Sequence, residues 1–573
     1  MSLTTLSVAT SGLRTAQMGL SVTGHNTANA NTVGYTRQRL NQQDYFSLNV
    51  GRSGNGTMQV GLGTDVASIA QIRDNFLDIQ YRQENGKQGF YQTMTDTGYE
   101  LQTILGELQS DYKLQDVFLD MWGALNQLST YQPGIDTRGN FISICQEFLS
   151  KVQNCYDQSV KYQESLNNQV IDSVSRINDI VSGIKDLNSK IVMNEIGGSR
   201  ANDFRDQRNA LLDELSGYID IEVACQPDGS VDILTDGNYL LSHGDINKIG
   251  LKYTAPSCDF VEPVFTNSSR PLPYDAPPGT YASVINLNQP VNARDNTDKG
   301  QLKALLISRG FAPANYAAGT ERPDIGSYAG DPLGYRQASQ SYFDATQSMI
   351  PCFQRQLDTL VNSVVTMIND KFAPNKGDPP MFDAAGAPYN AYGQNNPPFE
   401  IFQRAGTPRY TADADGNYIY NQPDPSDPAT LYTIKNIALN PALSDTSGSS
   451  LLPFSKSGDA EDTALIQELL TQWQQPSIDL MPGGLPLSVQ NAYSAIVNNI
   501  AAKTNQAQGY LQAQQNLTVQ LDSQRQTVSG VSLDEELTKM MTYQYAYSAA
   551  SRVVSVVNDM LGTLIQRTGR AGL

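Results

Sequence analysis

LSVATSGLRTAQMGLSVTGHNTANANTVGYTR (residues 6–37) and LDEELTKMMTYQYAYSAASRVVSVVNDMLGTLIQ (residues 533–566) are the two stretches that decide the fold of this chain. In both, apolar residues recur at steps of three and four, which keeps side chains on one face of an α-helix. In the first stretch they are Leu6, Ala9, Leu13, Ala16 and Leu20. In the second, interrupted by Glu536, they form a near-heptad, coiled-coil seam of Leu533, Met540, Tyr543, Tyr547, Ala550, Val554, Val557, Leu561 and Leu564.

Both ends are almost free of charge. Residues 1–36 contain one charged side chain, Arg14, and residues 540–566 contain two, Arg552 and Asp559, although 17% of the whole chain is charged. A helix with an apolar stripe and a neutral polar face has little charge repulsion to keep copies apart. We therefore expect the two ends to pair and to become ordered by packing against other subunits. The alternative is that they are ordinary amphipathic helices of one globular core.

The segments beside these helices carry a family resemblance. NTANANTVGYTR at residues 26–37 resembles the signature at the start of bacterial flagellar rod, hook and hook-associated proteins. GVSLDEEL at residues 530–537, followed by YQYAY at residues 543–547, resembles the C-terminal signature of the hook-associated members. The segments 61–77, 201–208 and 300–306 agree with the same members. The resemblance covers the helical parts of the chain and fades in the middle.

The resemblance implies a structural axial protein of the flagellum, forming the junction between hook and filament and templating filament assembly. It implies self-association in a helical or ring assembly, a hook protein below, a second junction protein above, and an export chaperone with a type III export apparatus. The terminal helices would form the inner wall. The alternatives are a hook or distal-rod subunit, or a secreted adhesin or enzyme displayed on axial-protein ends, with its activity in residues 311–450.

The residues expected at the assembly interface come from both terminal helices and from the turn after the first one. Asn and Gly in that turn tolerate unusual backbone angles. The set is Leu6, Leu13, Leu20, Asn29, Asn31, Tyr35, Leu537, Met540, Tyr543, Tyr547, Val554, Val557, Leu561 and Leu564.

Between the ends, the pattern predicts an α+β multidomain protein in which a long-helix bundle carries inserted β-rich domains. A 573-residue chain is too long for one compact core. Asp203 is the expected N-cap of one short helix, and Asp228-Gly229 and Asp236-Gly237 are tight-turn signals between strands. The expected domains are a terminal helical domain with a flexible Gly-rich linker (1–60 plus 531–573), a helical rod domain (61–220 plus 301–310, 348–373 and 461–530), an inserted β domain (221–300), an insertion (311–347) and a second β or irregular region (374–460).

Composition excludes several classes of function. The formal charge of −19 argues against binding nucleic acid or anionic membranes. No apolar run approaches the ~18 residues that a membrane-spanning helix needs. The N-terminus lacks a basic region followed by an apolar run, so we expect no Sec signal peptide. An extracellular location at the hook–filament junction would then depend on the type III route that the resemblance implies.

Residues suited to catalysis or metal binding are sparse. The two histidines, His25 and His243, form no zinc motif, and no phosphate-binding P-loop is present. Asp413 to Asn417 superficially resembles a calcium loop, but its spacing is wrong and favours a turn. The five cysteines form no CxxC pair, and we expect them to be reduced packing residues. We expect no enzyme activity, cofactor or metal.

Overall fold

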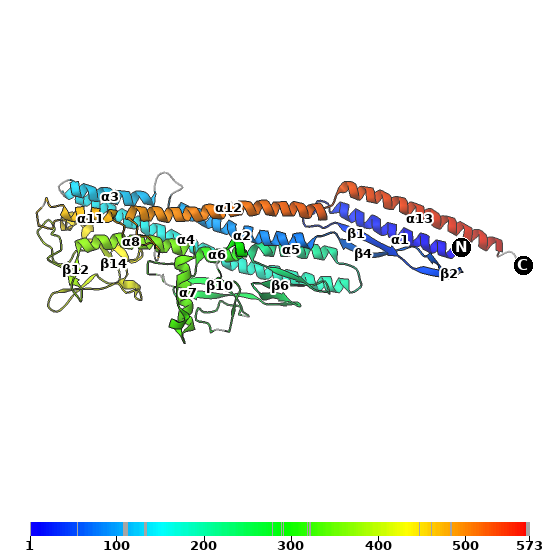
Figure 1. The fold of residues 1–573 in the computed structure, drawn as a ribbon, viewed down its shortest axis with the longest axis horizontal. Coiled ribbons are helices and arrows are strands. Elements are labelled where there is room, and N and C mark those ends of the chain that lie inside the picture. Colours follow the sequence, from blue (N-terminus) through cyan, green and yellow to red (C-terminus); the bar gives the residue numbers. More distant parts are fainter. Residues whose placement is uncertain are drawn as a thin grey trace.

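The computed structural model describes residues 2–568 except 54–55, 107–112, 131–133, 267, 278, 288, 290, 318, 320–321, 446, 460 and 482–483. The molecule is elongated, with its long helices running along one axis and both termini at the same end (Figure 1). The end of the expected terminal domain, residues 569–573, lies outside the described residues. The expected α+β architecture of long helices and small inserted sheets is confirmed. The domain boundaries themselves stay predictions.

A bundle of helices forms the body of the molecule. The longest, α4, has 61 residues, which corresponds to about 90 Å. Helices α2 and α12 lie side by side along the upper edge, and α5 and α6 pack against α2 and α4 (Figure 1). We call this group the helical body; its members are α2 (Asn75–Ile104), α3 (Leu114–Thr130), α4 (Ile135–Glu195), α5 (Asn202–Tyr218), α6 (Gln301–Arg309), α8 (Ile350–Phe372), α11 (Ala464–Gln474) and α12 (Val489–Ser529).

The helical body holds the main hydrophobic core. On α4, apolar residues recur at helical spacing, and Val170, Ile177 and Ile184 are fully buried. They belong to one cluster with Leu357 of α8 and Ile496 of α12. Burial of this continuous stripe is what stabilises so long a helix, because propensity alone contributes little.

Two antiparallel sheets pack beside α4. One has the order β5 (Glu222–Cys225), β6 (Val231–Thr235), β7 (Asn238–Ser242) and β8 (Asp245–Ile246); the other has the order β11 (Ala282–Ser283), β10 (Cys258–Phe265) and β9 (Ile249–Ala255). The predicted turns at Asp228-Gly229 and Asp236-Gly237 are confirmed, and Gly229, Asp236 and Gly237 have the positive φ angles that such turns require.

The far end carries small strands and short helices between α8 and α11. The strands are β12 (Asn375–Lys376), β13 (Met381–Phe382), β14 (Phe402–Arg404), β15 (Tyr410–Ala412), β16 (Tyr418–Tyr420) and β17 (Ile437–Leu439), with helices α9 (Pro441–Ser444) and α10 (Gly448–Leu451). The Asp413 side chain accepts hydrogen bonds from the backbone N–H groups of Asp415 and Asn417 between β15 and β16. The turn predicted there is confirmed.

The segment 311–347 contains α7 (Pro332–Thr346), which projects to one side of the body (Figure 1). Two buried carboxylates fasten this segment. Asp344 accepts from the backbone N–H of Phe311 and Ala312, and Asp358 of α8 accepts from Tyr316 and Ile434. Burial raises the pKa of both carboxyl groups to about 7.

The terminal module consists of α1 (Ser2–Ala28), α13 (Leu533–Thr568), β1 (Gln38–Asp44), β2 (Ser47–Ser53), β3 (Gly56–Gly61) and β4 (Thr64–Gln71). Strands β1 and β4 form one antiparallel pair, and β2 and β3 form a second. Helix α1 lies against α13 and also contacts β1 and β4.

Three local expectations were wrong. The Gly-rich segment 51–63, expected as a flexible linker, instead contributes residues 51–53 to β2 and 56–61 to β3 of one hairpin, and residues 54–55 lie outside the described residues. The N-cap of α5 is Ala201, and Asp203 lies in the first turn of that helix. Cys145, Cys155 and Cys352 are buried free thiols as expected, but Cys225 is exposed on β5, because residue 225 lies at the end of a short edge strand.

Candidate assembly interface and the joint beside it

Helices α1 and α13 run antiparallel in close contact, which we call the terminal seam. Asn26 bonds Glu536, Gly19 lies under the ring of Tyr543, and Gly12 faces Ala550. Each step of seven residues back along α1 matches seven residues forward along α13, which is heptad geometry. The seam therefore joins residues that are 510 positions apart in the chain.

Small residues on α1 permit this close approach. A Cβ atom added to Gly19 would lie 2.5–2.6 Å from three ring atoms of Tyr543. The neighbouring residues Ala9, Ala16 and Thr23 are buried on the same face. Large residues on α13 thus pack into a groove lined by small residues on α1.

The expected interface residues divide between this seam and the surface. On α13, Val557 is buried, and Met540, Tyr543, Val554 and Leu561 are half-buried on the same heptad stripe. Leu537, Tyr547 and Leu564 are exposed. Leu6, Leu13 and Leu20 are half-exposed on the flank of the seam.

A second stripe of α13 faces away from the seam. We call it the outer stripe: it consists of exposed apolar residues, namely Leu537, Met541, Tyr545, Val553, Val556 and Met560. An apolar stripe of this length on one helix is unusual for a monomer surface. The role of all these residues in assembly remains a prediction.

The turn after α1 is held by Asn26. Its amide Nδ2 donates to the Gln38 carbonyl (2.9 Å) and to Glu536 Oε2 (2.9 Å), and its Oδ1 accepts from the Tyr35 hydroxyl (2.7 Å) and the Gln38 N–H (3.0 Å). Asn29 bonds the His25 carbonyl within the same turn, whereas Asn31 is exposed. Burial, together with nearby carboxylates, raises the pKa of Tyr35, so its hydroxyl remains a donor.

Glu536 is the residue that interrupts the predicted apolar seam, and the structure explains it. It is fully buried, and it accepts from Asn26 and from Lys539 Nζ at 2.7 Å. A buried carboxylate requires such partners. Gly12, Gly19 and Asn26 were not predicted as seam residues, although their seven-residue spacing is a detectable signal.

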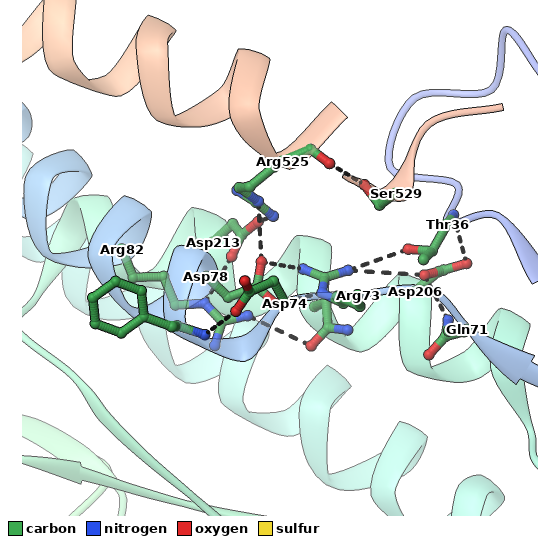
Figure 2. A network of polar contacts seen from close by, with 12 residues as sticks. Thr36, Gln71, Arg73, Asp74, Asp78, Arg82, Asp206, Asp213, Arg525 and Ser529 are labelled. Carbon is green, nitrogen blue, oxygen red and sulfur yellow. Dashed lines mark hydrogen bonds and ion pairs between the residues drawn. The ribbon is translucent and has the colours of Figure 1, made fainter. Parts of the chain in front are cut away.

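Beyond this turn, a polar network joins the terminal module to the helical body. Figure 2 shows Arg73 between Asp78 and Asp206, with Arg525 reaching Asp78 and Asp213 from α12. The distances from Arg525 to these two carboxylates are 3.0 Å and 2.6 Å. Pairing with arginines offsets the cost of burying these acids.

Asp206 of α5 holds the signature turn to the helical body. Its carboxylate accepts from the backbone N–H of Thr36 (3.1 Å) and from Gln71 Nε2 (2.7 Å). Arg73 is farther away, at 3.9 Å. Burial raises the pKa of Asp206 to about 6, and the hydrogen bonds from Thr36 and the charge of Arg73 oppose the increase.

The described part of the chain was searched for metal sites and membrane-spanning helices. It contains no group of three His, Cys, Asp or Glu side chains placed to hold a metal ion, and no helix in it is both long and apolar enough to cross a bilayer. His25 faces Asp203 at 3.5 Å beside the joint, and the side chain of His243 is largely exposed at a turn.

The chain is similar in sequence to known flagellar proteins. Family models match at residues 6–36 (Flagella basal body rod protein), 99–373 (Flagellar hook-associated protein FlgK helical domain) and 523–567 (Flagellar basal body rod FlgEFG protein C-terminal). Flagellar hook-associated protein 1 of Bacillus subtilis is 26% identical across 99% of this chain and 98% of its own length. The Escherichia coli protein of that name is 24% identical across 97% and 98%.

The chain belongs to the family of flagellar hook-associated protein 1. A solved structure agrees in fold: the flagellar hook junction protein FlgK from Burkholderia pseudomallei has a TM-score of 0.53 and 14% identity, and covers 79% of this chain and 100% of its own. A flagellar hook protein of Borreliella burgdorferi is 41% identical, but only over 11% of this chain. The hook-associated family thus accounts for nearly the whole chain, and the hook protein matches a small part.

The close contact at Gly19 can be tested against a matched glycine in the same seam. Gly19→Ala places a methyl group against the Tyr543 ring and should cost about 1–3 kcal/mol of terminal-module stability. Gly12→Ala meets Ala550 at an ordinary 3.9 Å and should be neutral or stabilising by up to about 1 kcal/mol, because alanine favours helix. Hydrogen exchange of the α13 amides measures both, and equal effects would contradict the close-contact argument.

The Asn26–Glu536 bond yields a second prediction. Asn26→Ala leaves a buried carboxylate with one partner fewer and should cost about 1–3 kcal/mol. In the Glu536→Gln background the penalty should be smaller, because no charge is left uncompensated. A double-mutant cycle on α13 exchange rates gives the coupling energy, and additive effects would show that the bond contributes nothing.

Asp206 should make stability pH-dependent. Its pKa is about 6 in the fold against an ordinary 3.8, so the folded state holds the proton more tightly than the unfolded chain between these values. Its contribution is therefore greatest below the unfolded pKa and is lost as the pH rises through about 6. From pH 4 to 7, wild type should lose roughly 2–3 kcal/mol relative to Asp206→Asn. Urea titrations at both pH values test this, and a constant difference would contradict it.

Proposed function

We propose that this chain is a structural subunit of the bacterial flagellum that forms the junction between hook and filament and offers a lattice on which the filament assembles. The observation that carries the proposal is the match to proteins named flagellar hook-associated protein 1 over 97–99% of the chain. A purely structural role, without catalysis, is part of the proposal.

The terminal module suits self-association in a helical or ring assembly. Its outer stripe leaves apolar side chains such as Met541, Val556 and Met560 in water, where their burial by another subunit would be favourable. Few charged groups flank them on α13. Copies of this chain, with the hook protein below and a second junction protein above, are the proposed partners, and nucleic acid and membrane are not among them.

The location proposed is outside the cell, at the hook–filament junction. The route proposed is passage as an unfolded chain through the flagellar type III apparatus, with a chaperone and without a Sec signal peptide. The near-neutral sequence of the terminal helices is compatible with a channel wall that does not trap passing chains. The hook-subunit alternative is disfavoured by the short extent of the hook-protein match.

The decisive experiment removes residues 533–573 from the protein in its own bacterium. Deleting α13 exposes the seam face of α1 and should prevent assembly of the junction. Electron microscopy should then show bare hooks, and the medium should contain unassembled flagellin. Missing hooks would place the protein lower in the axis, and normal filaments would refute the axial role.

Substitutions at two adjacent valines distinguish an effect on folding from an effect on assembly. Val557 is 6% exposed in the terminal seam, whereas Val556 is 51% exposed on the outer stripe. Val557→Asp buries a charge and should loosen the pairing of α1 with α13 in the monomer by several kcal/mol. Val556→Asp should leave monomer exchange rates within about threefold of wild type, yet reduce the number of filaments per cell. Normal filament numbers with Val556→Asp would show that the outer stripe is not an assembly surface.

A further inference from the structure

A cleft of about 460 Å³ opens on the helical body at the base of α7. Segments that are far apart in sequence form its walls: residues 90–94 of α2, residues 291–293 before α6, residues 343–349 at the corner between α7 and α8, and residues 503–510 of α12, together with Ile307 of α6. A volume of this size is typical of a site for one small molecule.

The walls of this cleft are largely apolar and firmly packed. Six of the lining side chains are at most 7% exposed, namely Phe90, Tyr91, Ile307, Phe343, Met349 and Ala507. All of these except Met349 belong to one hydrophobic cluster. The rings of Tyr91 and Tyr510 lie 4.9 Å apart between α2 and α12. The cleft is therefore already formed in the free chain, and binding requires little further ordering of the protein.

One charged side chain lines the cleft, that of Lys503 on α12. It is half-buried, and it forms no ion pair with any residue that the structure describes. The carboxylate of Asp298 accepts from the Tyr91 hydroxyl at 2.6 Å but is not among the lining groups. The other polar side chains in the lining are the neutral amides of Asn292, Gln347 and Gln506. The cleft thus combines apolar walls with one ammonium group that lacks a counter-charge.

This combination selects among three classes of ligand. A small inorganic anion would gain little from a single lysine that is still in contact with water. A neutral apolar molecule would bury surface on the walls but would leave the ammonium group without a partner. A molecule with an apolar chain and one negative charge would use both features. A monocarboxylate also carries only one charge into the field of a chain whose formal charge is −19.

We propose that the cleft binds an aliphatic monocarboxylate of medium chain length. The hydrocarbon chain packs on Phe90, Ile307 and Phe343, and the carboxylate accepts hydrogen bonds from Lys503 and from the Gln506 amide, which lies three residues away on the same helix. Because the walls come from α2, α12 and the base of α7, an occupied cleft should also hold the α7 corner more firmly on the helical body.

Calorimetric titration of the full chain with octanoate, and with octanol as a neutral ligand of similar shape, tests the role of Lys503. Lys503→Gln should lower the ratio of octanoate affinity to octanol affinity roughly tenfold, because only octanoate pairs with the ammonium group. Lys503→Arg keeps the charge and should keep most of this ratio. The matched control is Lys161→Gln, which removes one exposed lysine from α4 outside the cleft and should leave the ratio unchanged.

Two results of this titration would overturn the proposal. The first is an absence of octanoate binding by the wild type. The second is an affinity ratio that Lys503→Gln does not change, or that Lys161→Gln lowers equally. The apolar walls are tested by chain length: affinity should rise roughly fourfold with each methylene group from hexanoate to octanoate, and equal affinities would contradict burial of the chain in the cleft.

Hydrogen exchange shows where octanoate binds. Saturating octanoate should slow exchange of the amides at residues 343–349 and 503–510 in the wild type, and should do so much less in Lys503→Gln at the same concentration. Slower exchange only along the exposed outer stripe of α13 would place the ligand there and overturn the assignment. None of these measurements involves assembly, so their outcome is independent of the proposed junction role.

Discussion

The close antiparallel contact between α1 and α13 is the constraint on which the rest of the architecture depends. Because Gly19 and Gly12 bring the two helix axes together, the chain must return to its starting point after more than five hundred residues. The rest of the chain therefore lies between two neighbouring helices. Helix α2 leads the chain away from the terminal module, and α12 leads it back. The sheets beside α4, the small strands between α8 and α11, and α7 are inserted into this path at places remote from the α1–α13 contact.

Different interactions stabilise the helical body and its joint with the terminal module. The helical body is held by apolar burial, and its interior accepts few conformations because close-packed side chains resist displacement. The joint is held by carboxylate–arginine pairs and by backbone bonds to Asp206. Such contacts orient one body on another without a large apolar area. The two bodies are thus held internally by apolar packing and joined to each other by polar contacts.

Much of this followed from the sequence. The segments expected in the helical rod domain contain α4 and α8, and apolar residues seven positions apart share a buried face on each helix: Val170 and Ile177 on α4, Leu357 and Val364 on α8. The turn residues at 228–229 and 236–237 located the first sheet. Glu536 could not be understood from pattern alone, because its partner Asn26 is distant in sequence. Leu6, Leu13 and Leu20 were predicted because they are large and apolar. The face of α1 that contacts α13 instead consists of small residues, which let the large side chains of α13 approach closely. The β2–β3 hairpin was missed because glycines in a short strand resemble a linker.

The 510-residue separation of Asn26 and Glu536 has a consequence for the order of folding. Closing so long a loop in an unfolded chain is entropically costly. Once Asp78 of α2 and Arg525 of α12 are held together, the chain still to be closed shortens roughly eightfold, which lowers the closure cost by about 2 kcal/mol. We therefore expect the helical body to fold first and to bring the two ends together. The terminal helices should then be the last part of the molecule to become ordered, and a chain with an incompletely folded body should lack a folded terminal module.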